Sequence, residues 1–291
     1  MEGRAAAPGA GTVVNALATG RGSAFALDFE TTATVRLDPD AATVSGTIAG
    51  APDGDTTLIE RCVERVVDRY GTDEGGVVET TSEVPTAAGL KSSSAAANAA
   101  VVAALSALGL EVANDPDADV TKTEACRVGV RAAREAGVTV TGAFDDASAS
   151  MLGGVTVTDN TEDELLARDD PFAEHALVWT PPERAYSADA DASACEQVAP
   201  MAELATDLAL DGDYARAMTV NGLAFSAALG FSAEPAVAAM AHCDGVSLSG
   251  TGPSVVAVGD RSDLAVVEEQ WADRDGATRL VETRKRGARV L

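Results

Sequence analysis

The chain has 291 residues and a formal net charge of −25, which comes from 46 acidic and 21 basic residues. The long-range field of such a chain repels phosphate, so the composition argues against nonspecific binding to nucleic acid or to an anionic membrane. Hydrophobic residues make up 46% of the chain and aromatic residues only 4%, so the core must be built from alanine, valine and leucine.

The acidic residues are spread along the whole chain, and only three of the basic residues are lysines. This balance is typical of a salt-rich cytoplasm, where salt screens the self-repulsion of the chain; an acid-rich protein from an ordinary cytoplasm is the alternative. No secretory leader opens the sequence, and polar residues interrupt its most apolar stretch, residues 94–110. The sequence therefore predicts a cytoplasmic protein without a membrane span, whose four distant cysteines are reduced.

The first half of the chain mixes strands with helices. Alternating and β-branched residues predict strands in the first 50 residues, and the apolar residues of 55–70 share one helical face that ends at Gly71. Residues 138–142 are strand-like and lead into a short helix. The other expected strands are 23–37, 42–48 and 76–84, and the expected helices are 55–70, 93–109 and 120–136.

The second half continues this mixture. Residues 160–174 are acidic and are predicted to form a loop that joins two lobes. No repeat period links the elements, so the sequence predicts the α+β class, with an N-terminal lobe over 1–160 and a C-terminal lobe over 161–291. Strands are expected at 175–180, 245–249, 254–259 and 278–283, and helices at 194–209, 211–228, 234–242 and 262–272.

One stretch, PTAAGLKSSSAAA at residues 85–97, places small residues directly ahead of an alanine-rich helix. Gly89 can adopt dihedral angles closed to other residues, which lets the backbone approach a ligand. Ser92, Ser93 and Ser94 stand where the helix begins. Free N–H groups there form a site for a polyphosphate, and a serine hydroxyl can bind Mg²⁺. The alternative is a serine N-cap with no ligand.

A second stretch, TGAFDDAS at 141–148, carries two adjacent carboxylates. Asp145 or Asp146 can accept a proton from a hydroxyl group or bind Mg²⁺, and the alternative is a plain helix N-cap. The chain contains neither a Walker A loop nor the GxGxxG of a Rossmann site. His242 beside Cys243 is too small a donor set for zinc.

Two glycine-rich stretches complete the candidate site. In SGTGPS at 249–254, Gly250 and Gly252 flank Thr251, either as a plain hairpin or as a second wall around phosphates. APGAGTVVNALATGRGSAF at 7–25 carries Asn15 and Arg21 as its main polar side chains. Arg21 can pair with a substrate carboxylate, although a surface arginine explains it equally well.

In this combination and order, the four stretches resemble the GHMP kinase superfamily of galactokinases, homoserine kinases, mevalonate kinases and their relatives. PTAAGLKSSSAAA is similar to the phosphate-binding motif of that superfamily, and GTGPSVVAV is similar to its C-terminal glycine motif. GRAAAPGAGTVVNALATGRGSAFAL, GLKSSSAAANA and TGAFDDASAS resemble the archaeal-type shikimate kinases, and this likeness covers essentially the whole chain. Lys91 stands where most members have glycine, which adds a cation beside the phosphates.

The resemblance implies a two-lobed fold, with a ribosomal-protein-S5-like N-terminal lobe, a ferredoxin-like C-terminal lobe and ATP in the cleft between them. It also implies phosphoryl transfer from MgATP to the 3-hydroxyl of shikimate, a reaction of aromatic amino-acid synthesis. We expect small-molecule partners only, without nucleic acid or membrane, and a monomer or homodimer.

The resemblance implies roles for single residues as well. Asp145 aligns with an aspartate that orients or deprotonates the acceptor hydroxyl, while Asp146 falls where an asparagine often stands, so which aspartate acts stays open. Ser93 aligns with a magnesium-binding serine, and Glu135 stands about one residue from the position of a magnesium glutamate. Arg21, with Asn15, is expected at the substrate. The residues expected at the nucleotide are Pro85, Thr86, Ala87, Ala88, Gly89, Leu90, Lys91, Ser92, Ser93, Ser94, Ala95, Gly250, Thr251 and Gly252.

Two alternatives remain open: another small-molecule GHMP kinase, such as a homoserine kinase, and a catalytically inactive GHMP-fold protein that senses a metabolite. Asp145 favours shikimate, because homoserine kinases typically lack the matching aspartate. The intact serines and aspartates argue against an inactive sensor.

Overall fold

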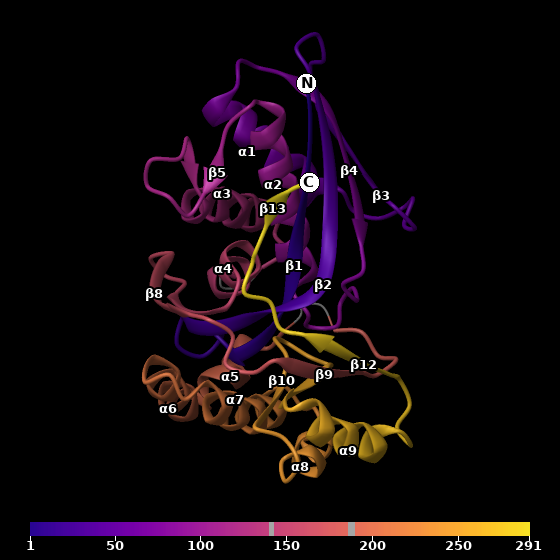
Figure 1. Cartoon of the computed structure of the whole chain (residues 1–291), viewed down its shortest axis with the longest axis vertical. Coiled ribbons are helices and arrows are strands. Elements are labelled where there is room, and N and C mark those ends of the chain that lie inside the picture. The colour runs from indigo at the N-terminus through magenta and orange to yellow at the C-terminus, as the bar shows by residue number, and fades with distance from the viewer. Residues whose placement is uncertain (140–142, 186–189) are drawn as a thin grey trace.

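The molecule consists of two stacked halves, each a sheet with helices packed on it (Figure 1). This computed structural model describes residues 1–139, 143–185 and 190–291. Both termini lie in the upper half of Figure 1, because β13 (Arg289–Val290) returns the end of the chain to β1 (Glu2–Val14). In the described ranges, no helix is both long enough and apolar enough to span a membrane.

The upper sheet is organised around two long antiparallel strands, β1 and β2 (Arg21–Asp38). Its main path has the order β13-β1-β2-β4-β3, and one end of β2 pairs with β7, which in turn pairs with β8. The strand β3 is parallel to β4, whereas the other pairs of this sheet are antiparallel. The bounds are Val44–Ile48 for β3, Gly75–Ser82 for β4, Val155–Asp159 for β7 and Glu164–Asp169 for β8.

The helices of the upper half surround α2 (Ser92–Ala107), which is buried on nearly every side. A helix that is apolar all round needs neighbours all round, and alanine lets them approach closely. A Cβ at Gly3 of β1 would overlap the Ala103 carbonyl, which shows how closely strand and helix pack. The neighbours are α1 (Thr57–Tyr70), α3 (Lys122–Glu135), α4 (Phe144–Leu152) and the short pair β5 (Val112–Ala113) and β6 (Val120–Thr121).

The lower half is a βαββαβ arrangement of the ferredoxin-like kind that the resemblance implies. Its strands follow the order β10-β11-β9-β12, and every neighbouring pair is antiparallel. The strands are β9 (His175–Thr180), β10 (Gly245–Leu248), β11 (Val255–Gly259) and β12 (Ala277–Glu282). The helices are α5 (Ala192–Glu196), α6 (Ala199–Leu210), α7 (Tyr214–Ala228), α8 (Glu234–Ala239) and α9 (Arg261–Trp271).

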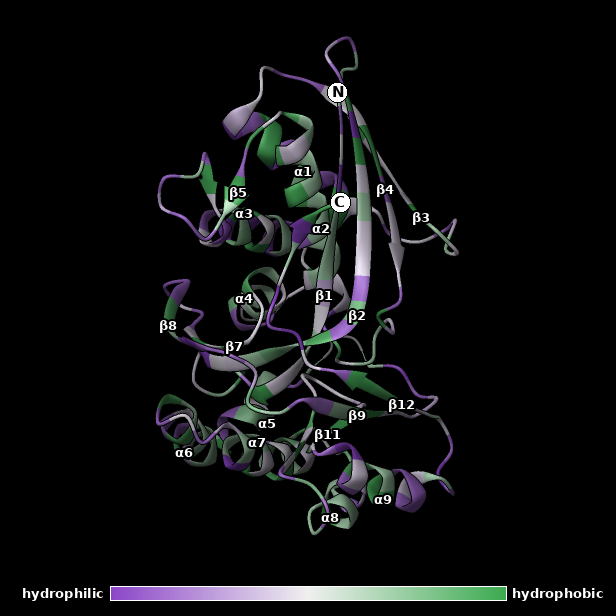
Figure 2. Ribbon diagram, in the orientation of Figure 1, coloured by the Kyte–Doolittle hydropathy of each residue, from purple (hydrophilic) through white to green (hydrophobic). Residues whose placement is uncertain are grey.

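A shared core joins the two halves. Phe25 and Leu27 of β2 pack in one cluster with Val256 and Val258 of β11 and with Met218 of α7. Figure 2 shows hydrophobic residues on β12 and α9 and hydrophilic residues in connecting segments. Because this core is continuous, loops from both halves meet at defined positions beside it.

Most of the predicted elements are confirmed to within a few residues, and two are wrong. Residues 160–174 contain β8, an edge strand whose acidic residues resemble a loop in composition. The helix predicted at 194–209 is two helices, α5 and α6, because Pro200 can stand only in the first turn of a helix. Residues 140–142 of the strand-like piece lie outside the described ranges.

The division into lobes at residue 160 stays a prediction. The strands β8 and β13 both follow this residue and both belong to the upper sheet.

Trp271 anchors α9 under the lower sheet and gives a test of this packing. Its side chain is 1% exposed, and its indole N–H donates to the Pro235 carbonyl at 3.0 Å. We expect Trp271→Ala to lower the free energy of unfolding by about 3–5 kcal/mol, because it opens a cavity and leaves this carbonyl unpaired. Val237→Ala, at a position 57% exposed, should change it by less than about 0.5 kcal/mol. Urea unfolding in molar KCl measures both; equal losses would contradict the packing.

Candidate active site

The loop before α2 lies directly against the loop between β10 and β11, residues 249–252. Gly89 has φ +77°, and a Cβ there would overlap the carbonyl oxygen of Ser249. The Ser249 hydroxyl donates to the Gly89 carbonyl at 2.9 Å, across 160 residues of sequence. The Ser254 N–H donates to the Ala88 carbonyl at 3.4 Å. Two stretches that the sequence singles out independently therefore form one surface.

The end of β1 and the turn that follows it hold the 249–252 loop in place. The Gly250 N–H donates to the Thr12 hydroxyl at 2.7 Å, and the Asn15 amide donates to the Gly250 carbonyl at 2.8 Å. The Asn15 side-chain oxygen accepts from the Leu17 N–H at 2.9 Å. Asn15 is buried and both ends of its amide are engaged within the protein. Its contact with a substrate stays a prediction, whereas its contact with Gly250 is observed.

The N-terminus of α2 opens onto this surface without a side-chain cap. The N-cap position is occupied by Lys91, which makes no capping hydrogen bond, and the first turn contains no acidic residue. The serine N-cap that the sequence left open as an alternative is therefore not formed. Ser93 is exposed, and its neighbours Ser92 and Ser94 are both half-buried. The free N–H groups and the positive end of the helix dipole are available to an anion.

The remaining residues expected at the nucleotide belong to the same two loops. Leu90 and Ala95 are buried beneath the surface, and the Leu90 carbonyl accepts from the Ala10 N–H of β1 at 3.2 Å. The outer part of the surface consists of Pro85, Thr86, Ala87 and Thr251, whereas Ala88 and Gly252 are buried.

Lys91 places a cation between the two loops and α4. Its φ is +64°, a left-handed conformation that glycine adopts freely and that costs other residues about 1–2 kcal/mol. This geometry explains why glycine is usual at this position in the superfamily. The Lys91 ammonium lies 2.9 Å from the Asp146 carboxylate, and its side chain is 7% exposed. A Cβ at Gly250 would lie 2.6 Å from the same nitrogen, so the charge stands at the wall of the site.

Asp145 is a buried carboxyl group in the first turn of α4. It is 5% exposed and lies against the backbone of β2, since a Cβ at Gly22 would overlap its carboxylate. Burial, followed by the charge of Asp146, raises the pKa of Asp145 to about 7, while Lys91 and a hydrogen bond from Asn160 oppose this rise. A group with this pKa exchanges protons near neutral pH, as a general base for an alcohol requires.

Asn160 holds Asp145 in place and was not found from the sequence. Its amide N–H donates to the Asp145 carboxylate at 2.7 Å, and its carbonyl oxygen accepts from the Asp145 backbone N–H at 3.0 Å. The Thr158 hydroxyl donates to the same oxygen at 2.8 Å, which fixes the orientation of the amide. The triplet TDN, residues 158–160 at the end of β7, was the sequence signal that could have identified Asn160. Only the pairing of β7 with β2, however, brings this residue to α4.

A polar pocket of about 440 Å³ lies between α6 and the paired ends of β2 and β7. Arg21 lies in its wall, exposed, with its guanidinium 3.8 Å from the Asp159 carboxylate. Successive residues of a strand point to opposite faces, so Arg21 and Asp159 face this pocket from the side of the sheet opposite to Asp145, which lies against Gly22. The other lining residues are Thr19, Thr161, Glu203, Thr206 and Asp207, of which the last three belong to α6.

The residues at the start of α4 fit a magnesium ion in part. One Asp146 oxygen is buried and has no aligned hydrogen-bond donor, although Lys91 is near it. Ser93 presents an exposed hydroxyl at the start of α2. No group of three or more His, Cys, Asp or Glu side chains that could hold a metal occurs among the described residues. Mg²⁺ can be held by one or two carboxylates when phosphates and water complete its coordination.

Glu135 is not brought to this site in the structure. It ends α3 facing α1, where its carboxylate pairs with Arg65, and both side chains are exposed. The preceding residue, Arg134, turns instead toward the site and donates to the Asn160 carbonyl at 3.2 Å. Adjacent residues of a helix point in different directions, so Arg134 reaches the site while Glu135 points toward α1. The role of Glu135 as a magnesium ligand stays a prediction.

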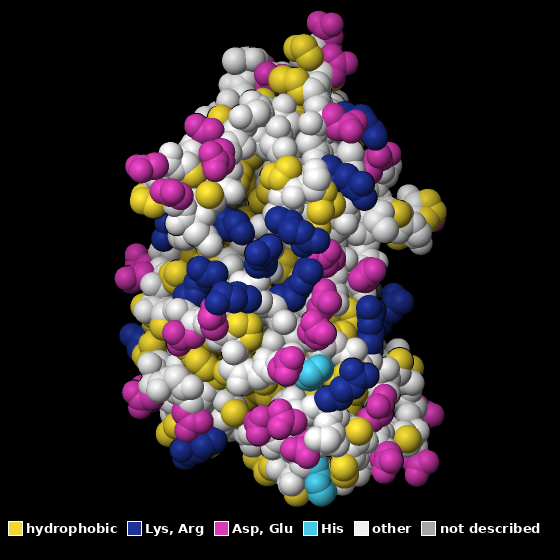
Figure 3. Space-filling model, in the orientation of Figure 1, with side chains coloured by type: hydrophobic (Ala, Val, Ile, Leu, Met, Phe, Trp, Pro, Cys, Tyr) yellow, Lys and Arg dark blue, Asp and Glu magenta, His cyan; other side chains and the backbone are white. Residues whose placement is uncertain are grey.

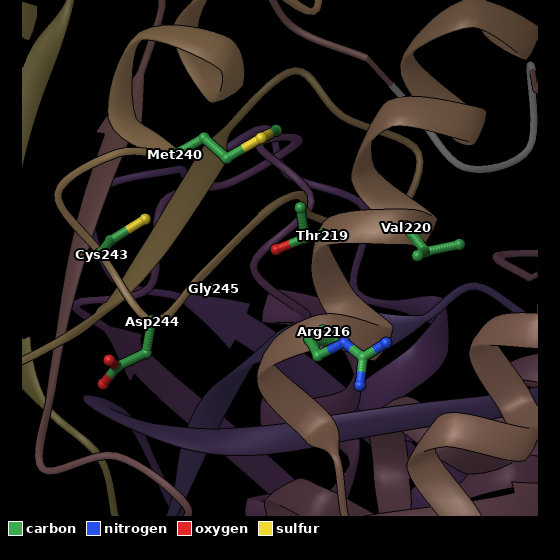
Figure 4. Close-up of a pocket in the computed structure, with 7 residues that line it drawn as sticks. All are labelled: Arg216, Thr219, Val220, Met240, Cys243, Asp244 and Gly245. Atoms are coloured by element: carbon green, nitrogen blue, oxygen red, sulfur yellow. The ribbon is translucent and has the colours of Figure 1, made fainter.

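A second pocket, of about 320 Å³, lies between α7, α8 and the turn before β10 (Figure 4). Arg216, Thr219, Met240 and Cys243 line it, and none of them belongs to the loops around α2. Burial raises the pKa of Cys243 to about 11, so its thiol is protonated at neutral pH and is a poor nucleophile. This pocket takes no part in the chemistry described here.

Comparisons with known proteins agree with this geometry. Residues 57–154 match the family model described as "GHMP kinases N terminal domain". A shikimate kinase of Halobacterium salinarum is 62% identical over 290 residues, which cover 100% of both chains. A shikimate kinase of Methanosarcina mazei is 46% identical over 285 residues, which cover 97% of this chain and 94% of the relative.

Solved structures of low identity share the fold. A homoserine kinase from Cytophaga hutchinsonii superposes with a TM-score of 0.76 at 18% identity, over 100% of this chain and 97% of that one. The mevalonate kinase of Methanococcus jannaschii superposes with a TM-score of 0.73 at 12% identity, over 97% and 98% of the two chains.

The family match and the shared two-lobed α+β fold identify a small-molecule kinase of the GHMP type, which uses ATP. The open N-terminus of α2 between glycine loops and the buried Asp145 agree with this class. Identity over the full length narrows this class further: the chain belongs to the archaeal shikimate kinase family. The two relatives at 62% identity come from Halobacterium salinarum, which agrees with the salt-adapted composition.

The contact at Gly89 is tested by comparison with Gly109. Both residues have nearly the same positive φ, but a Cβ at Gly109 would meet nothing within 4 Å. We expect Gly109→Ala to cost about 1–2 kcal/mol of stability and to leave nucleotide affinity unchanged. Gly89→Ala should cost more and weaken nucleotide binding at least about tenfold, because the two loops must separate. Thermal unfolding and ADP titration measure both effects; equal behaviour of the variants would show that the close contact is unimportant.

Asn160→Ala should raise the pKa of Asp145 further, because the hydrogen bond from Asn160 stabilises the carboxylate. Only ionised Asp145 accepts a proton, so kcat/KM falls as pH drops below its pKa, which is about 7 in the wild type. In the variant this fall should begin at a higher pH, because the hydrogen bond that favours the carboxylate is lost. Thr161→Ala, at the exposed neighbour, is the control. An unchanged acid limb would remove Asn160 from this role.

Proposed function

We propose that the protein is a shikimate kinase, which transfers the γ-phosphate of MgATP to the 3-hydroxyl of shikimate and releases shikimate 3-phosphate and ADP. The observation that carries the proposal is Asp145, a buried carboxyl held by Asn160 beside Asp146, which pairs with Lys91 at the open end of α2. The shikimate kinases to which the chain is similar over its full length support the choice of substrate.

The phosphate end of the reaction needs alignment and charge neutralisation more than covalent chemistry. The first-turn N–H groups of α2 and the backbone around Gly89 and Gly250 offer donors to the phosphate oxygens. Lys91 adds a cation that is already positioned by Asp146. We assign Mg²⁺ to Ser93 and Asp146, where it would neutralise charge on the phosphates when bound.

The acceptor end of the reaction needs a base and a pocket. We assign to Asp145 the acceptance of the hydroxyl proton, a contribution of about 10²–10⁴-fold to the rate. Arg21 can pair with the carboxylate of shikimate, and the carboxylates of Glu203 and Asp207 can accept hydrogen bonds from its hydroxyl groups. Arginine and carboxylates in one pocket thus match an acceptor that is both an acid and a polyol.

The setting of the reaction follows from the same features. We place it in the cytoplasm, where free thiols persist, since all four cysteines are free. A monomer or a homodimer suffices, because every residue invoked here belongs to one chain.

An acceptor panel tests the substrate. In molar KCl with MgATP, we expect ADP release with shikimate and little release with homoserine, mevalonate or galactose. Asp145→Asn should lose at least about 10²-fold in kcat while still binding nucleotide, because it removes the base and keeps the shape. Turnover of homoserine without turnover of shikimate would favour a homoserine kinase. Nucleotide binding with no turnover of any acceptor would favour a metabolite sensor.

Arg21→Gln separates the two ends of the site. We expect the KM for shikimate to rise about tenfold or more while the KM for ATP stays unchanged, because a charge-assisted contact contributes about 1.5–3 kcal/mol. Arg216→Gln is the matched control, since Arg216 is also an exposed arginine paired with an aspartate, Asp213. A normal KM for shikimate in Arg21→Gln would place the substrate carboxylate elsewhere.

A further inference from the structure

Basic side chains gather on one face of this acidic protein. Figure 3 shows Lys and Arg side chains clustered over α4 and the C-terminal segment, with acidic side chains scattered over the rest of the face. Residues 284–289 contribute Arg284, Lys285, Arg286 and Arg289. Lys122 of α3 and Arg168 of β8 lie beside this segment. A concentration of cations is unexpected in a chain of net charge −25.

Arg168 contacts the last carbonyl groups of α4. Its Nη2 donates to the Leu152 carbonyl at 2.7 Å, and its Nε donates to the Gly153 carbonyl at 3.3 Å. A cation is favourable at a helix C-terminus, so this contact accounts for two of the N–H donors of the guanidinium. Three of its five N–H donors remain, and among the described residues no carboxylate oxygen lies within 4.0 Å of it.

Lys122 is half-buried, and among the described residues no carboxylate oxygen lies within 4.0 Å of its ammonium. Its ammonium donates to the Ala288 carbonyl at 2.6 Å, and the Ala288 N–H donates to the Ser150 carbonyl of α4 at 3.0 Å. Lys122 and Arg168 are thus both tied to the C-terminal end of α4, so two like charges lie in the same region. The pKa of Lys122 is lowered accordingly, first by burial and then by the charge of Arg168. Helix capping does not explain Lys122, because its partner is not a helix carbonyl.

The carboxylates around this pair are engaged with other groups. Asp170, directly after β8, pairs with Lys285 at 2.5 Å. Asp169 accepts from the Tyr214 hydroxyl, Glu124 bonds Thr121, and Glu30 pairs with Arg284 and Arg289. In the part of the chain that the structure describes, no carboxylate within 4.0 Å compensates the charge of Lys122 or Arg168.

We propose that Lys122 and Arg168 form a second anion site, separate from the active site, that binds a phosphate group. A phosphate group supplies the missing negative charge and enough oxygens for both residues. An ammonium binds it as a point charge and a guanidinium as a planar fork. Arg286, exposed and two residues before Ala288, adds positive charge at the rim. Free phosphate and a phosphate ester present the same oxygens, and the test distinguishes them.

This site lies at the opposite end of α4 from Asp145. The helix has nine residues, so its ends are about 13 Å apart. The nucleotide phosphates, by contrast, are proposed at the N-terminus of α2. The two sites can therefore be examined independently in one protein.

The scarcity of lysine gives a site-resolved test. Amine acylation followed by peptide mass spectrometry reports Lys91, Lys122 and Lys285 separately. With KCl held constant, inorganic phosphate at ten times its Kd should slow labelling of Lys122 about tenfold, because occupancy follows mass action. Lys285, exposed and paired with Asp170, should keep its rate, and Lys91 reports on the active site. Glycerol 3-phosphate in a parallel series shows whether an ester binds better than free phosphate.

Arg168→Gln should abolish the protection of Lys122 by phosphate. Arg127→Gln is the matched control, because Arg127 also donates through Nε and Nη2 to a backbone carbonyl, that of Asp163. Protection retained in Arg168→Gln would overturn the proposal. So would a wild-type Lys122 rate that ignores both phosphate and glycerol 3-phosphate, a result that stands even if the variant does not fold.

Discussion

The direct contact of two backbones, at Gly89 and at the 249–252 loop, is the constraint on which the site depends. A Cβ at Gly89 would overlap the Ser249 carbonyl, so the two backbones meet directly at this position. Thr12, in β1, and Asn15, directly after it, then fix the second loop to the upper sheet. These contacts connect the upper sheet, α2 and the lower sheet at one place. Lys91 adopts its left-handed conformation directly beside it.

An acidic protein that binds polyphosphate presents an apparent contradiction, which the range of each interaction resolves. At molar salt the Debye length is about 3 Å, so the field of distant carboxylates is screened before it reaches a ligand. Contacts at hydrogen-bond distance, such as those offered by Lys91 and the first turn of α2, are screened much less. The high salt that suits the surface therefore also lets a few local positive groups determine binding.

The sequence predicted the parts of the site that lie within a single motif. Gly89, the serines and Asp145 were found because small residues, a helix start and a paired carboxylate are local patterns. Asn160 was missed because its contact with Asp145 depends on strand pairing. Glu135 and Arg134 are adjacent, and sequence spacing alone could not tell which one turns toward the site. The strand β8 was read as a loop, because an exposed edge strand tolerates the acidic residues that loops favour.

The position of β13 has a consequence for synthesis of the chain. Its residues pair with Ala5 and Ala6 of β1, and the Leu291 N–H donates to the Arg4 carbonyl at 2.9 Å. At about 5–20 residues per second, a ribosome adds this strand roughly 15–60 s after the first residues. The edge of β1 at Ala5 and Ala6 therefore stays unpaired until residues 289–290 have been synthesised, and the upper sheet is completed only then.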